Sequence, residues 1–214
     1  MKRHSRTALV ALVTALLAAA PVLAGEKLVM QDDFSNDGSG WVNTQVADHN
    51  AKGIALYDGS GGYQMTPVDD ATYGVMPAPR QAKGADVRVE ANLFLYTGVG
   101  QGTGGVVCRH ADNDHFYAFM VSGGHGYAIL KVQGGQATTL TSGRFEGTMP
   151  NIADVRIGAQ CVGSSLKLSL DGEVVAEADD AALTKGGAGL IVMGEKTAGT
   201  SAVFDNFELA EIAN

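Results

Sequence analysis

The chain has 214 residues, of which 45% are hydrophobic and 18% are charged, and its formal net charge is −8. This length allows one domain with a sizeable core, and an acidic chain without a basic stripe argues against binding to nucleic acid or anionic membrane surfaces. The 29 glycines fall in clusters between apolar runs rather than at every third position, which is typical of many tight turns and excludes a collagen-like chain.

Residues 1–24 have the pattern of a secretory signal peptide. Three basic residues within positions 2–6 precede the apolar run Ala8–Ala20, and a small-residue cleavage pattern ends at Ala24. The run is shorter than the ~20 apolar residues that span a bilayer, so a membrane anchor is the weaker alternative. We therefore expect residues 25–214 to be secreted or periplasmic, without membrane insertion. Removing three Lys or Arg and no acid leaves 12 cations against 23 acids, a net charge of −11.

Alternation of apolar and polar residues predicts β-strands along the rest of the chain. The first strands are Leu28–Phe34, Ile54–Tyr57, Gly62–Thr66 and Thr72–Met76. From Gly84 to Val132, four further strands joined by tight turns predict an antiparallel meander. The later strands are Ala137–Thr141, Ile152–Cys161, Leu166–Leu170, Glu173–Glu177, Ala188–Met193 and Ala202–Leu209. One short helical turn is expected within 178–184. Many short strands at regular spacing predict an all-β, two-sheet antiparallel sandwich.

The meander also predicts one face that carries charged and aromatic side chains. In the strand that begins at Val87 the odd-numbered residues are apolar, so the even-numbered residues point to the other side. A hairpin after Arg109 would place that residue beside Tyr117 on the same face. The residues expected to face outward together are Arg88, Glu90, Arg109, Tyr117 and Lys131. Such a face suits a polyhydroxylated ligand, and a solvated face with cross-strand ion pairs is the alternative.

Two cysteines and three histidines are candidates for covalent or metal chemistry. Cys108 and Cys161 lie in predicted strands, and an even count in an exported chain favours a disulfide over two buried thiols. His110, His115 and His125 lie near successive turns of the meander. Because alternate turns of a meander lie at opposite ends of the sheet, these histidines are not expected to share a zinc ion.

Several segments, taken in order, resemble the concanavalin A-like lectin/glucanase superfamily, which includes laminin-G-like modules. The segments are Asp32–Phe34 with Gly40-Trp41, Val107–Arg109 with Asp114–Phe119, Cys161–Gly172, and Phe204–Phe207. The likeness runs from Lys27 to Glu211 and is nearest to laminarinase-type and 3-keto-disaccharide hydrolase-like domains. It implies a concanavalin A-like jelly roll, with a concave face that holds carbohydrate in many relatives.

The same resemblance implies a structural calcium ion between the first and last strands. Asp205 stands at the matching position of the last strand, and Asp33 is a plausible neighbour. Calcium takes several oxygen ligands, so two Asp side chains do not suffice without backbone carbonyls. The alternative is that Asp205 caps a strand end or pairs with a lysine.

The expected activity depends on which carboxylates are present. Laminarinase-type relatives carry theirs as Glu-x-Asp-x-(x)-Glu on one strand, and this sequence has no such cluster: Glu90 has Arg88 and Asn92 as neighbours on its own face. The favoured hypothesis is an exported, non-catalytic module that binds a glycan or cell-surface polymer. A glycoside hydrolase of the 3-keto-disaccharide type, and a structural or protein-interaction module of the cell envelope, are the alternatives.

Overall fold

Strands make up nearly all of the regular structure in a computed structural model of the chain, which describes residues 25–43, 53–67, 73–97, 102–124, 126–145, 155–194 and 200–213. The predicted signal peptide lies outside these residues. No helix in the described ranges is long and apolar enough to cross a membrane. A single 3₁₀ turn, Asp37–Ser39, is the one helical element among them.

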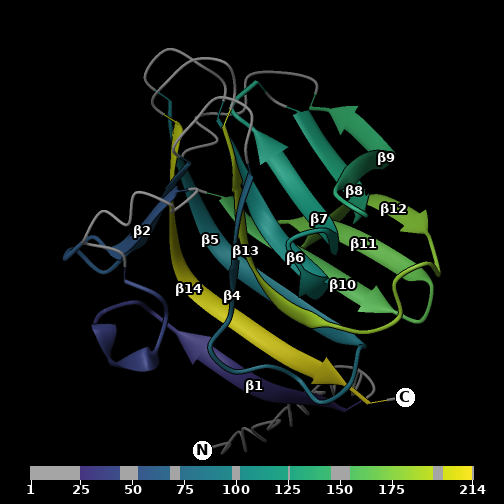
Figure 1. Cartoon of the computed structure of the whole chain (residues 1–214), viewed down its shortest axis with the longest axis horizontal. Coiled ribbons are helices and arrows are strands. Elements are labelled where there is room, and N and C mark those ends of the chain that lie inside the picture. Colours follow the sequence, from purple (N-terminus) through teal and green to yellow (C-terminus); the bar gives the residue numbers. More distant parts are fainter. Residues whose placement is uncertain are drawn as a thin grey trace, which may run out of the picture.

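The strands form two antiparallel sheets (Figure 1), as predicted. Sheet A has the order β12-β11-β10-β5-β14-β3-β2, with β1 also paired to β14, and sheet B has the order β4-β13-β6-β7-β8-β9. The strands of sheet A are β1 (Glu26–Asp32), β2 (Gly53–Tyr57), β3 (Tyr63–Pro67), β5 (Val87–Thr97), β10 (Val155–Val162), β11 (Ser165–Leu170), β12 (Glu173–Asp179) and β14 (Thr200–Ile212). Those of sheet B are β4 (Tyr73–Pro77), β6 (Thr103–Asp112), β7 (His115–Ser122), β8 (Gly126–Gln133), β9 (Gln136–Arg144) and β13 (Gly187–Met193).

The predicted four-stranded meander is wrong for its first strand. β5 pairs with β10 and β14 in sheet A, whereas β6, β7, β8 and β9 form a true meander in sheet B. The chain therefore changes sheet between β5 and β6. A glycine-rich segment such as the one between β5 and β6 can connect two strands of one sheet or two strands of different sheets. Strand periodicity alone therefore does not distinguish a hairpin from a crossing between sheets.

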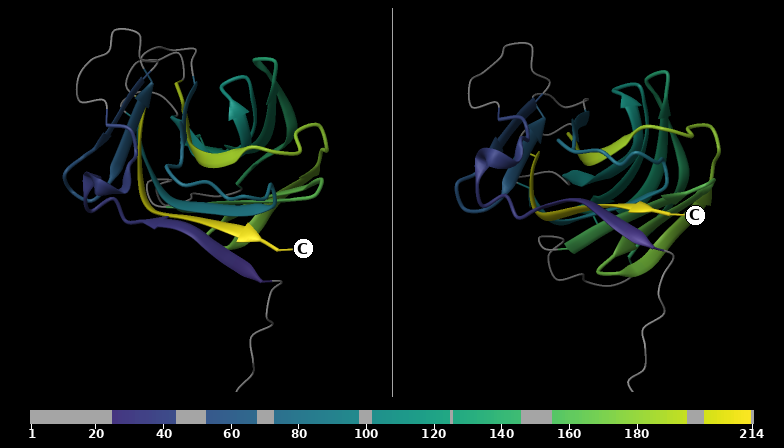
Figure 2. Two further views of the ribbon diagram at one scale, coloured as in Figure 1. Left: turned by 60° about the horizontal axis from the view of Figure 1, so that its bottom comes forward. Right: turned by 90° about the horizontal axis from the view of Figure 1, so that it is seen from below.

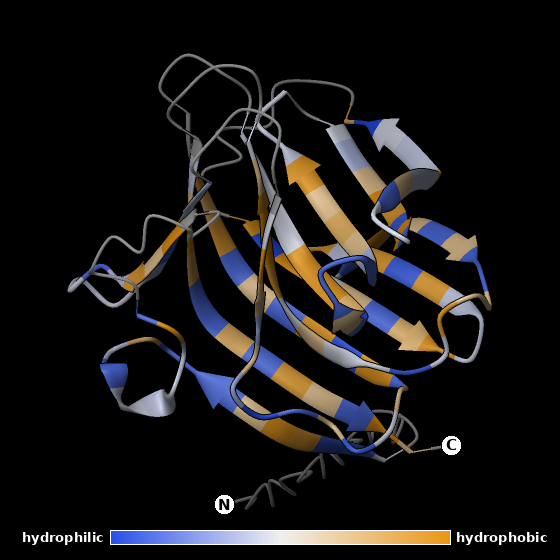
Figure 3. Cartoon of the chain, viewed as in Figure 1, coloured by the Kyte–Doolittle hydropathy of each residue, from blue (hydrophilic) through white to orange (hydrophobic). Residues whose placement is uncertain are grey.

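The main core lies between the sheets. The odd-numbered residues of β5, from Val87 to Leu95, are buried as the alternation predicted, and they pack with residues such as Phe119 and Ile129 of sheet B. Figure 3 shows this alternation as hydrophilic and hydrophobic bands along β5 and β14. Burial of apolar area on this scale is the main stabilising contribution to such a fold.

The predicted disulfide is confirmed. Cys108 of β6 and Cys161 of β10 are bonded, and both are fully buried. The bond crosses the core and joins sheet B to sheet A, because β6 and β10 belong to different layers.

Sheet B is apolar on both faces. Its inner face joins the main core, and a second cluster lies on the face that points away from sheet A: Val107, Phe116, Ala118, Met120, Val132 and Ile191, each at most 3% exposed. Figure 2 shows both sheets bending in the same direction, with sheet B on the inside of the curve. The concave face is thus floored by apolar side chains, none of them charged. Gly105 and Gly189 lie in the same rows, where a Cβ would collide with the neighbouring strand's backbone.

The helical turn expected within 178–184 is not formed. β12 extends to Asp179, and residues 180–186 then run without regular structure to β13. The polar contacts made by Asp180 in this segment take the place of helical hydrogen bonds.

Candidate functional site

The five residues predicted to share one outward face lie in two separate places. Arg88 and Glu90 are on the face of sheet A that points to solvent, as expected for even-numbered residues of β5. Arg109, Tyr117 and Lys131 are instead on the side of sheet B that faces sheet A, where Arg109 is 2% exposed and Tyr117 is fully buried. The prediction of a single ligand-binding face built from all five is therefore wrong.

A bulge explains why Arg109 is buried. The β6–β7 register shifts between Cys108 and Asp112, and Arg109 has a left-handed backbone with φ of 51°. A bulge re-aims a side chain, here towards the core. The predicted proximity to Tyr117 is confirmed, because the guanidinium carbon lies 6.0 Å from the centre of the Tyr117 ring. Within hydrogen-bonding reach are the carbonyls of Gly163 and Leu183 and the carboxylate of Asp86.

Tyr117 and Lys131 both bind Asp180, and we name this group the Asp180 junction. The Tyr117 hydroxyl donates to Asp180 Oδ1 at 2.6 Å, and Lys131 Nζ donates to Asp180 Oδ2 at 2.7 Å. Burial, with help from the Asp180 hydrogen bond, raises the pKa of Tyr117 to about 12. The junction ties the segment after β12 to β7 and β8.

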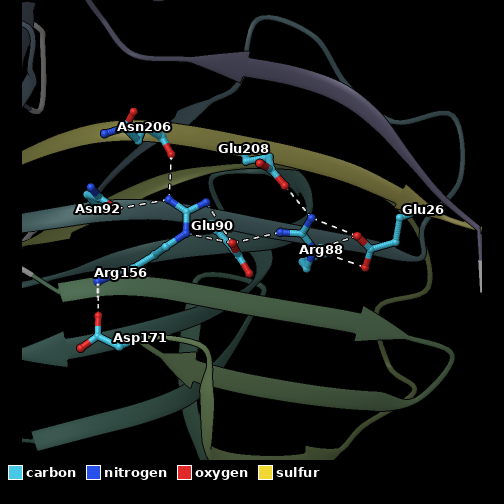
Figure 4. Close-up of polar contacts among 8 residues, drawn as sticks. All are labelled: Glu26, Arg88, Glu90, Asn92, Arg156, Asp171, Asn206 and Glu208. Atoms are coloured by element: carbon cyan, nitrogen blue, oxygen red, sulfur yellow. Dashed lines mark hydrogen bonds and ion pairs between the residues drawn. The ribbon is translucent and has the colours of Figure 1, made fainter. Parts of the chain in front are cut away.

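The solvent-facing side of sheet A carries a connected group of polar side chains, which we call the outer patch (Figure 4). It comes from four adjacent strands, β1, β14, β5 and β10, and its members are Glu26, Arg88, Glu90, Asn92, Arg156, Asn206 and Glu208. The ion-paired side chains keep between 20% and 33% of their surface exposed. They are thus held in place and still accessible to a ligand.

Arg88 is the centre of one half of the patch. Its guanidinium contacts the carboxylates of Glu26 at 2.9 Å and Glu90 at 3.0 Å, and that of Glu208 as well. Burial would lower the pKa of Arg88, but the hydrogen bonds that its guanidinium donates to Glu26 and Glu208, together with the nearby negative charges, outweigh burial and raise that pKa.

Arg156 organises the other half. It contacts Glu90 at 2.9 Å, Asn92 Oδ1 at 3.2 Å and the Asn206 carbonyl at 3.1 Å. Asn206 lies at a bulge of β14 in a left-handed conformation, which Asn tolerates better than most residues. Opposite Glu90 stands Gly158, where a Cβ would lie 3.1 Å from Glu90 Cγ, so the glycine makes room for the Glu90 side chain.

Sequence reasoning found Arg88 and Glu90 but missed the patch residues on other strands, which are Glu26, Arg156, Asn206 and Glu208. Each of these comes from a strand far away in the sequence, and the strand register that brings them together was not readable beforehand. The one local indication in the sequence was the alternation of apolar and polar residues around Asn206. A bulge in β14 interrupts this alternation, so it did not predict which side chains reach the patch.

The calcium expected at Asp33 and Asp205 stays a prediction. β1 ends at Asp32, which pairs with Phe207 of β14. Asp33 directly follows Asp32, and Asp205 lies two positions before Phe207, so both carboxylates are near this end of the β1–β14 pairing. The Asp33 carboxylate accepts the Ser35 amide, and that of Asp205 accepts the Asn206 amide. Across the described parts of the chain, no three His, Cys, Asp or Glu side chains are grouped to hold a metal ion. The two carboxylates by themselves do not make a calcium site.

Two of the three candidate histidines lie within the described residues. His110 packs against the Phe116 ring at 5.8 Å, and His115 binds Asp112 at 2.8 Å. His125 lies outside the described residues. The two described histidines lie at the same end of sheet B, and Asp112 interacts electrostatically with both of them.

Comparison with known proteins establishes the fold. No family model and no curated protein matches the chain. Among solved structures, the carbohydrate-binding module CBM66 from Bacillus subtilis aligns over 87% of this chain and 96% of its own, with 18% identity and a TM-score of 0.57. The catalytic domain of a laminarinase from Thermotoga petrophila aligns over 90% and 100%, with 11% identity and a TM-score of 0.61.

A third similar structure is the GH43 protein BlXynB from Bacillus licheniformis, with 16% identity and a TM-score of 0.62. The alignment covers 84% of this chain but only 38% of BlXynB, so the likeness is to one part of that protein. Identities this low show the fold and nothing finer. The chain is a concanavalin A-like jelly roll, as the sequence resemblance implied.

Proposed function

We propose that this chain is an exported, non-catalytic carbohydrate-binding module and that the outer patch contacts the glycan. The observation that carries the proposal is a surface where two guanidinium groups, the Asn92 amide and three carboxylates are fixed by one another, while the ion-paired side chains remain partly exposed. Polar groups held in place before binding lose little freedom when they meet sugar hydroxyls. Similarity in fold to a carbohydrate-binding module and to glycan-active enzymes supports the same class of ligand.

The concave face is the weaker candidate for this role. In many relatives of this fold that face holds carbohydrate, but here its floor is the apolar cluster around Phe116 and Met120, which is closed to solvent. Sugar sites need several well-placed polar groups. The outer patch supplies them and this cluster does not.

One observation favours the alternative of a glycoside hydrolase. Glu90 and Glu208 are direct cross-strand partners, so two carboxylates stand side by side on sheet A. A glycosidase needs one of its two carboxyl groups protonated to act as the acid. Here both carboxylates are ion-paired with Arg88, and Glu90 is also paired with Arg156, so both are engaged in contacts within the patch. We therefore favour binding without turnover.

Export rests on two features. The pattern of residues 1–24 is that of a secretory signal, and the buried Cys108–Cys161 bond is of the kind that forms in oxidising compartments. Both features fit a module that works outside the cytoplasm.

Thermal unfolding of the oxidised protein with a panel of soluble oligosaccharides tests the proposal. A ligand that binds only the folded state raises the midpoint, by an amount equivalent to about 2.7 kcal/mol at a hundredfold excess over Kd. We expect a shift for at least one sugar, its loss in Arg156→Ala, and its retention in Lys167→Ala, which removes a more exposed ion pair with Glu177. No shift with any sugar would instead favour a structural or protein-interaction module, for which retention of an envelope protein is the assay.

Calcium and a chelator form two further arms of the same assay. We propose that a structural calcium ion is held by Asp205, by Asp33 and by nearby backbone carbonyls. A calcium-dependent rise in the midpoint that Asp205→Asn removes would support this site, and an unchanged midpoint would count against it.

A further inference from the structure

The solvent-facing side of sheet A continues beyond the outer patch. Two residues past Asn92 on β5 is Phe94, which is half-buried on the outer side while Leu93 and Leu95 face the core. Phe94 is the cross-strand partner of Val203 on β14, and Val203 pairs in turn with Gln64 on β3. The row next to the outer patch therefore carries an aromatic ring.

A second polar group lies on the far side of this ring, and we call it the hydroxyl cluster: Gln64, Thr66 and Ser201. Gln64 Nε2 donates to Ser201 Oγ at 2.8 Å, and the hydroxyls of Thr66 and Ser201 are 2.9 Å apart. All three side chains are uncharged and only partly buried. They come from β3 and β14, which lie beside β5 in sheet A.

The order of these groups across the sheet suits a chain of sugars. At about 3.3 Å per residue, Asn92 and Phe94 are about 7 Å apart along the strand, and Arg88 and Phe94 about 20 Å apart. An aromatic ring between two polar groups can stack on the apolar face of one sugar while hydrogen bonds hold its neighbours. A surface of this length is more than one sugar ring requires.

The charges of the outer patch restrict the ligand further. All the guanidinium nitrogens of Arg88 already contact Glu26, Glu90 or Glu208. Those of Arg156 contact Glu90, Asn92 or the Asn206 carbonyl. An anionic sugar would find no unoccupied cation there and would meet carboxylates instead, at a cost in electrostatic repulsion.

We infer that the ligand is an uncharged oligosaccharide that lies across Phe94, with the hydroxyl cluster on one side of it and the outer patch on the other. Phe94 is then the residue on which a sugar ring stacks, and the site prefers a chain over a single terminal sugar. This inference rests on the proposed function. It adds that the ligand is an uncharged oligosaccharide and that Phe94 is the residue that selects it.

Calorimetric titration of the oxidised protein tests the inference with neutral hexasaccharides of xylose and of β-linked glucose, the matching disaccharides, and hexagalacturonate. We expect one neutral hexasaccharide to bind at least tenfold more tightly than its disaccharide, and no binding of hexagalacturonate. Phe94→Ala should weaken hexasaccharide binding by tenfold or more, Phe94→Tyr should retain it, and Gln64→Ala should reduce the preference for the longer chain.

Val174→Ala is the matched control, because Val174 is an exposed apolar residue outside the proposed site. It lies on β12, the edge strand of sheet A that is separated from β5 by β11 and β10. Each variant is first shown to unfold cooperatively, and Phe94→Tyr guards against a general loss of folding in Phe94→Ala. Sugar binding that Arg156→Ala abolishes but Phe94→Ala leaves unchanged would overturn this inference and leave the proposed function standing. Tighter binding of hexagalacturonate would also overturn it, and absence of binding to any sugar would refute the proposed function itself.

Discussion

Arg109 places a positive charge between the two sheets, where only 2% of its surface is exposed. Transfer of a charge into such an environment is unfavourable unless hydrogen bonds and an opposite charge accompany it. The carbonyls of Gly163 and Leu183 supply the hydrogen bonds, and Asp86 supplies the charge. The residue thereby fastens the β10–β11 turn and the segment before β13 to β6.

Arg109→Met should lower the free energy of unfolding by about 3 to 5 kcal/mol, because it leaves two carbonyls without a donor and Asp86 without its cation. Urea denaturation measures this as a lower midpoint. Lys167→Ala is the control, since an exposed ion pair contributes at most about 1 kcal/mol. A loss below about 1 kcal/mol in Arg109→Met would show that the contacts of Arg109 with Gly163, Leu183 and Asp86 are dispensable for stability.

The Asp180 junction makes stability depend on pH. Burial would raise the pKa of Asp180, but the hydrogen bonds from Lys131, Tyr117 and the Ala182 amide outweigh burial and lower that pKa. A lowered pKa in the folded state means that the stabilisation is complete above the unfolded value of about 3.9 and is lost as pH falls through the folded value. The difference in unfolding free energy between wild type and Asp180→Asn should thus be constant from pH 7 to 5 and shrink below pH 4. Denaturation at several pH values measures it, and a difference unchanged at the lowest pH contradicts the assignment.

At the scale of single strands, the alternation of β5 was predictable and its sheet was not. Which residues of β5 are buried follows from the period of two, which is a local property. Whether β5 pairs with β6 or with β14 depends on contacts more than a hundred residues apart along the chain. The bulges at Arg109 and Asn206 lie outside a strict period of two, so the buried arginine and part of the outer patch escaped sequence reasoning.

The disulfide between β6 and β10 should be a large single contribution to stability. It closes a loop of 53 residues, which in the chain-entropy model stabilises the folded state by about 4 kcal/mol. Replacement of both Cys108 and Cys161 by alanine should therefore lower the unfolding free energy by about 4 kcal/mol. Unfolding by guanidinium chloride, for this variant and for wild type, each with and without reductant, measures the loss of unfolding free energy. Reductant should destabilise only the wild type, and an equal effect on both would point to another cause.

The whole molecule has two outer faces of opposite character. The convex side of sheet A carries a network of ion pairs, and the concave side of sheet B carries a buried apolar cluster. Composition and periodicity predicted the two-sheet sandwich and the disulfide, because both follow from local patterns and from a count of two cysteines. They could not predict which face is polar, because that depends on how strands from both ends of the chain are shared between the sheets.

The position of the last strand has a consequence for how the protein is made. β14 pairs with β1, β3 and β5, so three strands of sheet A lack their common partner until residues 200–212 have been synthesised. Pairings so distant along the chain form slowly, since loop closure must come before the contacts that stabilise it. Sheet A of a newly made chain is therefore incomplete until this strand has been synthesised. The chain also stays exposed to aggregation and proteolysis until this final strand is in place.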